Sequence, residues 1–141
     1  MTQSFSAQVD DAIANSNKNL LILIQSSVQD VVHMAQTPVA KGGRMRVATG
    51  FLWSSGQASL TGVPSGPTRG SLTDENSYQF DASLASLTIA KMEIGSTLHF
   101  GWTADYAKYR EMHDGFLETA LQQWPQIVDR NANEILKRSN L

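Results

Sequence analysis

The sequence predicts an α+β fold, with a long N-terminal helix, a small antiparallel or mixed β-sheet carrying a long loop, and a C-terminal helix packed on the sheet. Three observations support this fold class. Apolar residues recur at the helical period near the N-terminus, Gly, Ser, Thr and Pro dominate the middle, and a strand pattern precedes a second helical stretch. The 141 residues are expected to form one domain with three regions, residues 1–37, 38–80 and 81–141.

The first region is predicted to be helical from about residue 4 to residue 36. Its apolar residues, from Phe5 and Val9 to Val32, follow a period close to 3.6. Pro38 should end the helix, because the residue before a proline is pushed out of helical geometry. The segment Asn15–Asn19 is poor helix material and favours a bend or a join between two helices. At about 1.5 Å per residue, such a helix would project beyond a small domain, which favours packing along a partner.

The second region is rich in turn-forming residues. Thr49 is a candidate cap for a short helical turn that holds Phe51, Leu52 and Trp53. The stretch "QASLTGV" could form a strand, and "TGVPSGPTRGSLTDENS" reads as a long loop. A loop of this length in a compact domain is normally functional, or disordered until it binds.

The third region contains a strand followed by helices. The stretch "DASLASLTIAKMEIG", with Asp81 as a candidate cap, fits either a short helix or a strand. "TLHFGW" alternates Leu98, Phe100 and Trp102 with smaller or polar residues, as in a strand with one buried face. A helix is predicted from Thr103 or Asp105, with an interruption at Gly115 and a kink or fresh start at Pro125.

Composition excludes several classes of function. The chain has no cysteine, which rules out disulfides, thiolate zinc sites and cysteine nucleophiles. A net charge of −2 argues against a strongly basic nucleic-acid module. No signal peptide is visible, and the longest apolar run, "LLILI", is too short to span a bilayer, so we expect a soluble cytoplasmic protein with no membrane partner. Few charges beside many amide and hydroxyl groups favour wide contacts with other subunits.

No motif in the sequence predicts catalysis. His33, His99 and His113 lack the spacing of metal ligands. His113 stands beside Asp114 and near Glu111, which could orient a general base, but the pattern is more typical of a surface histidine. Nucleophile-elbow and P-loop motifs are absent from the sequence. We therefore expect no enzyme activity, metal or cofactor.

One charge pattern predicts a contact surface. Between Asp30 and Asp74 the sequence has no acidic residue. The same stretch carries four basic residues, Lys41, Arg44, Arg46 and Arg69. Arginine matches phosphate and carboxylate groups, so these residues fit an acidic partner or a DNA backbone, and chance clustering on loops fits them equally well. Any DNA contact is expected to be independent of base sequence.

The aromatic residues of the third region could stack nucleic-acid bases. They are Trp102, Tyr106, Tyr109, Phe116 and Trp124. The apolar residues of this region recur every two residues on the strand and every three or four residues on the helices. This spacing favours a packing seam in the core or at an interface.

Two stretches together resemble a family of tailed-bacteriophage neck proteins, which includes tail-completion, head–tail joining and terminator-like proteins. "ATGFLWSSGQASLTGVPSGPTRG" resembles one block of that family, and "GSTLHFGWTADYAKYREMHDGFLETALQQW" resembles a second. The matching residues are Thr49, Gly50, Leu52, Ser55, Gly101, Trp102, Thr103, Ala104, Tyr106, Ala107, Gly115, Phe116, Ala120 and Trp124. Trp53 departs from the pattern, since family members often carry a basic residue there.

The resemblance implies the same α+β fold and no catalysis. It also implies a ring, hexameric or dodecameric, around the DNA channel at the head–tail junction of the virion, assembled in the host cytoplasm. Other neck proteins and the tail tube protein would be its partners, and Lys41, Arg44, Arg46 and Arg69 could contact them or the traversing DNA. We expect Trp53, Tyr109, Arg110 and Glu111 at the subunit interface. The alternative is a soluble, sequence-nonspecific nucleic-acid-binding module that uses the basic loop.

Overall fold

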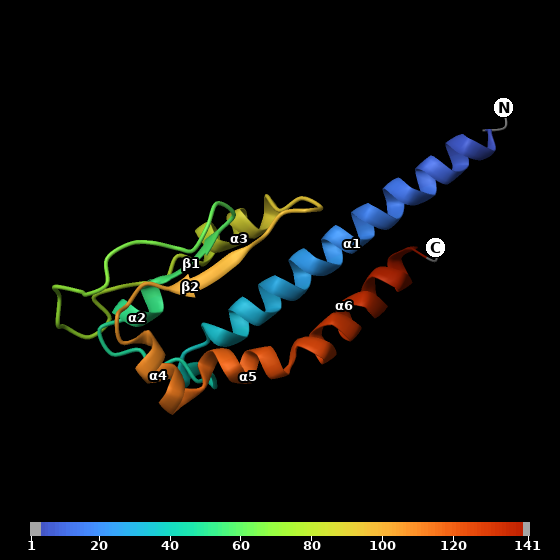
Figure 1. The fold of residues 1–141 in the computed structure, drawn as a ribbon. Coiled ribbons are helices and arrows are strands. Elements are labelled where there is room, and N and C mark those ends of the chain that lie inside the picture. The colour runs from blue at the N-terminus through green and yellow to red at the C-terminus, as the bar shows by residue number, and fades with distance from the viewer. Residues whose placement is uncertain (1–3, 140–141) are drawn as a thin grey trace.

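A computed structural model describes residues 4–139 and confirms the α+β class (Figure 1). The helices are α1 (Phe5–Ala35), α2 (Phe51–Ser54), α3 (Ala82–Ala90), α4 (Ala107–Asp114), α5 (Phe116–Gln122) and α6 (Trp124–Ser139), with a 3₁₀ turn, η1 (Val39–Lys41), after α1. The strands β1 (Gly56–Ser59) and β2 (His99–Trp102) pair antiparallel. The elements follow the predicted order of helix, strand and loop region, then strand and helices.

Helix α1 is continuous over 31 residues, so the predicted bend or join at Asn15–Asn19 is wrong. Each asparagine costs only a fraction of a kcal/mol, and a helix already formed on both sides gains a hydrogen bond for each residue it adds. The Ser4 side chain caps the first turn by accepting a hydrogen bond from the Ala7 amide. The helix ends just before Pro38, as predicted. Its N-terminal part extends past the rest of the chain (Figure 1).

The two-stranded sheet pairs Gly56 with Trp102 and Ser59 with His99. Strand β1 is therefore shorter than the predicted "QASLTGV" segment and ends before Leu60. The ambiguous stretch after Asp81 is a helix, α3, and the Asp81 carboxylate accepts a hydrogen bond from the Leu84 amide at 3.0 Å. The stretch has the N-cap that a helix requires.

Parts of the hydrophobic core lie on two sides of the C-terminal half of α1. Val32 packs with Ile89 of α3 and with side chains of the sheet, while Val31 packs with Ile127 of α6. Helices α5 and α6 run along α1 (Figure 1). Helix α5 contacts the sheet at Trp102 of β2, whose ring lies 4.9 Å from that of Phe116. The C-terminal helix therefore packs mainly on α1 and only partly on the sheet.

The long loop after β1 is held against the body of the chain. The Thr103 hydroxyl donates to the Pro67 carbonyl at 2.8 Å, and the Asp105 amide donates to the Thr68 carbonyl at 2.9 Å. Farther along, the Tyr78 hydroxyl accepts a hydrogen bond from the Ser71 amide at 2.9 Å. The loop thus has fixed contacts within a single chain. The sequence predicted either a functional loop or one that stays disordered until it binds a partner.

The C-terminal helices are separated where the sequence predicted breaks. Gly115 adopts a left-handed conformation, with φ of 64°, and ends α4. Pro125 is the second residue of α6, so it starts a new helix, since a first turn needs no amide donor there. Helix α4 begins at Ala107, later than predicted, and Tyr106 stands at its N-cap.

Candidate functional site

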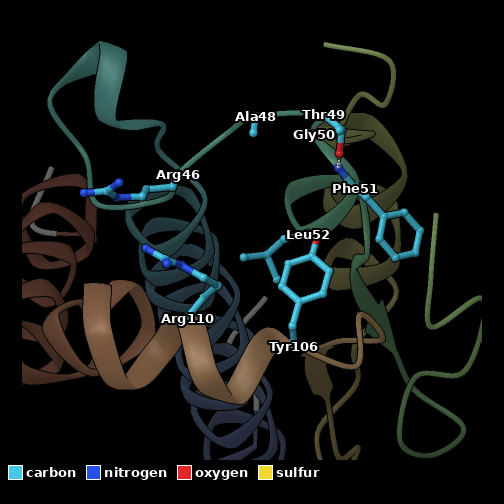
Figure 2. Close-up of a pocket in the computed structure, with 8 residues that line it drawn as sticks. All are labelled: Arg46, Ala48, Thr49, Gly50, Phe51, Leu52, Tyr106 and Arg110. Carbon is cyan, nitrogen blue, oxygen red and sulfur yellow. Dashed lines mark hydrogen bonds between the residues drawn. The ribbon is translucent and has the colours of Figure 1, made fainter. Parts of the chain in front are cut away.

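A cavity of about 290 Å³ lies beside the turn that opens α2. It is lined by Arg46, Ala48, Thr49, Gly50, Phe51, Leu52, Tyr106 and Arg110. Figure 2 shows Leu52 and Tyr106 at its centre, with the two arginines on one side and Phe51 on the other. Its floor is thus apolar and aromatic, and its charged groups stand at one end.

The turn at Thr49 and Gly50 positions one wall of this cavity. Gly50 has a φ of 89°, and a Cβ atom there would collide with the carbonyl oxygen of Tyr78. The Thr49 hydroxyl accepts a hydrogen bond from the Phe51 amide at 3.2 Å, so Thr49 supports the start of α2 from one residue before the N-cap, Gly50. Glycine is required here by both its conformation and the close approach of Tyr78.

Asp114 contacts the arginines near the charged end of the cavity. Asp114 accepts from Arg110 Nε at 2.9 Å and from Arg110 Nη2 at 2.7 Å, in a two-nitrogen contact. Arg46 Nε lies 3.5 Å from the same carboxylate, and Arg44 Nη1 donates to the main-chain carbonyl of Asp114 at 3.4 Å. The Asp114 side chain is only 10% exposed. Arg46 and Arg110 line the cavity, while Arg44 lines the neighbouring hollow beside His113. The two guanidinium groups at the end of the cavity outnumber this carboxylate, so this end suits a negatively charged group of a partner.

The predicted basic residues do not form one patch. Arg44 and Arg46 meet at Asp114, whereas Arg69 binds Asp105 at 2.7 Å. This hydrogen bond raises the pKa of Arg69 above its usual value. Lys41 lines another hollow, together with Arg130. Only Arg44 and Arg46 therefore remain as a paired contact surface.

The predicted interface residues differ in how far they are already engaged within the chain. The Trp53 indole donates to the Gln36 carbonyl at 2.9 Å, and Arg110 is held by Asp114. The Glu111 carboxylate accepts hydrogen bonds from the amides of Leu117 and Glu118 at 2.9 and 3.0 Å, which caps α5.

Tyr109 is the exposed member of the predicted interface set. Its side chain is 58% exposed, and its ring lies 4.5 Å from that of His113. Met112, which the sequence reasoning missed, is 77% exposed on the same helix. Met112 lies three residues after Tyr109, and this spacing places both side chains on the same side of the helix, so the sequence could have indicated Met112 as well.

The residues that carry the family resemblance meet in space. Leu52, Ala104 and Phe116 share one core cluster with Trp102 packed against it, while Gly50 and Tyr106 line the same cavity. Partial burial raises the pKa of Tyr106, so its phenol keeps its proton to a higher pH than an ordinary tyrosine does. The two matching blocks thus build one structural unit around the cavity.

Neither a metal site nor a membrane-spanning helix is found among the described residues, and no similar protein is found among the known proteins compared. Residues 4–139 contain no group of three or more metal-ligating side chains, and none of the helices in that range is long and apolar enough to cross a membrane. No protein-family model, curated protein or solved structure matches the chain.

Proposed function

We propose that the chain is a structural virion protein of a tailed bacteriophage. It is a ring-forming neck or tail-completion subunit that joins the DNA-filled head to the tail around the DNA channel. The observation that carries this proposal is the projecting half of α1, where Phe5 is 81% exposed, Ile13 55% and Leu20 48%. A monomer leaves these apolar side chains in water, whereas an assembly covers them.

The resemblance to neck proteins supports the same function. Its two blocks are distant in sequence and contribute to one core and one cavity, as expected if the resemblance reflects a shared fold. The low content of charged residues, 17%, also suits a subunit with large contact surfaces.

The test is the mass of the purified protein, measured alone and with candidate neck and tail tube proteins. We expect a closed ring, hexameric or dodecameric, in at least one of these mixtures. An image of the phage particle should then show the protein at the junction of head and tail. A protein that stays monomeric and binds neither partner would overturn the proposal.

A further inference from the structure

Within residues 4–139, two apolar surfaces are left uncovered by the rest of the chain, and the first lies on the projecting half of α1. Phe5, Val9, Ile13 and Leu20 follow one another at intervals of four, four and seven residues, so they lie along one side of the helix. Their exposed fractions are 81, 38, 55 and 48%. The stripe extends over about four turns of helix.

The second surface is the outer face of α3. Ala85 and Ile89 on the inner face are buried, while Leu84 and Leu87 are 61 and 59% exposed. Helix α3 has no charged residue from Ala82 to Ala90. A helix that is apolar on both sides is normally covered on both sides.

One subunit cannot cover either surface with the other. Helix α3 is fixed to the C-terminal half of α1, where Gln25 Nε2 donates to the carbonyls of Ala90 and Met92 at 3.3 and 3.2 Å. Because α1 is one straight, continuous helix, its N-terminal half cannot fold back onto the outer face of α3 (Figure 1). A second copy of the chain supplies both missing surfaces at once.

We propose that the subunits join head to tail, with the Phe5–Leu20 stripe of one copy packed on the Leu84–Leu87 face of the next. This inference rests on the proposed ring function and identifies its interface. The two surfaces differ, so the contact is heterologous, and repetition of a heterologous contact produces a closed ring when its rotation closes.

The charges at the edges of the two surfaces are complementary. Lys91 follows Leu87 by four residues and Leu84 by seven, so it extends the outer face of α3. Asp10 borders the α1 stripe next to Val9. Neither Asp10 nor Lys91 forms an ion pair within residues 4–139. Packing of the two faces would allow this acid and this base to pair between copies.

Cysteine cross-linking tests the contact, because the chain contains no cysteine of its own. Ile13→Cys and Leu87→Cys both replace exposed residues, so circular dichroism should show an unchanged fold. Oxidation of an equal mixture of the two variants should produce a covalent dimer, and neither variant alone should cross-link. A mixture of Ile13→Cys with Val63→Cys, which is exposed on the long loop, is the matched control and should stay uncross-linked.

The outcomes separate the interface from the ring. If the mixture forms rings but Ile13→Cys does not cross-link to Leu87→Cys, the interface is wrong and the ring proposal stands. Cross-linking of Ile13→Cys with itself would indicate a two-fold contact between α1 helices and would also overturn the interface. Wild-type protein that is monomeric with and without neck partners, together with no cross-link between Ile13→Cys and Leu87→Cys, would overturn both proposals.

Charge exchange provides a second, independent test. Asp10→Lys alone and Lys91→Asp alone should each weaken subunit association about tenfold, because each brings like charges together. The double variant should restore association to within about twofold of wild type. Equal losses in the single and double variants would contradict the pairing of these surfaces.

Discussion

The side-chain carbonyl of Gln36 accepts a hydrogen bond from the Trp102 indole at 2.8 Å, across 66 residues of sequence. The same side chain donates to the main-chain carbonyl of Trp53 at 2.9 Å, and the Trp53 indole donates back to the Gln36 main chain. Gln36 is 4% exposed. One buried amide therefore joins the end of α1 to α2 and to β2.

Replacing Gln36 with Leu should destabilise the fold by about 2–4 kcal/mol, because it leaves the Trp102 indole and the Trp53 carbonyl without their partner. Urea denaturation followed by tryptophan fluorescence measures this loss. Gln29→Leu is the control, since the two hydrogen bonds of Gln29 with Ser86 are exposed and longer: it donates to the Ser86 carbonyl at 3.4 Å and accepts from the Ser86 hydroxyl at 3.3 Å. A similar loss in both variants would refute the special role of Gln36.

Gly50→Ala should destabilise the fold by about 3 kcal/mol or more, through left-handed strain and the collision with the Tyr78 carbonyl. Gly42→Ala is a matched control, because Gly42 has the same φ of 89° but open space around it. That control should cost only about 1–2 kcal/mol. Thermal unfolding of the two variants would show whether close packing at Gly50 adds to the strain.

Asp114→Asn should destabilise the fold by about 1–3 kcal/mol, because the half-buried Arg110 loses its ionised partner. Asp105→Asn is the control, since the Arg69–Asp105 pair is largely exposed and should contribute less than about 1 kcal/mol. Chemical denaturation of both variants compares them. A loss at Asp105 as large as the loss at Asp114 would contradict this ranking.

Stability at alkaline pH should depend on Tyr106. Its pKa is raised in the fold, chiefly by burial, so its contribution is present below the usual tyrosine pKa and is lost as pH rises through the folded value. Wild type should therefore lose stability relative to Tyr106→Phe as the pH rises above about 10.

Tyr78 provides the contrast of opposite sign in the same denaturation series. Hydrogen bonds from the amides of Leu72 and Ser71 lower the pKa of Tyr78, so it stabilises the fold above the usual tyrosine pKa. Tyr78→Phe should therefore lose stability relative to wild type at high pH. The same sign for both variants would contradict these environments.

The predicted DNA contact can be tested on Arg44 and Arg46. If they touch the phosphate backbone, binding to duplex DNA should fall steeply with salt, and the change of both residues to Ala should reduce the slope by about 2. Arg69→Ala is the control, because Arg69 is held by Asp105. The absence of binding at low salt would exclude the nucleic-acid alternative.

Local patterns predicted most of the fold. The period of α1, the stop before Pro38, the break at Gly115 and the restart at Pro125 each depend on neighbouring residues alone. The predicted break at Asn15–Asn19 was wrong, because extending a helix that is already formed on both sides outweighs the weak local preference of these residues.

The candidate site could not be predicted in the same way. Arg44 and Asp114 are 70 residues apart, and no local pattern shows that they meet. Similarly, the four basic residues lie in one stretch of sequence, but Asp114 brings Arg44 and Arg46 together, whereas Asp105 binds Arg69 elsewhere. Partners that are far apart along the chain decide which charges remain available.

The length of α1 has a mechanical consequence for the whole subunit. Its 31 residues extend about 46 Å, and its C-terminal half is fixed between α3 on one side and α5 and α6 on the other. A force applied at Phe5 therefore acts through a long lever arm on the packed half of α1, and not on Gln36 alone.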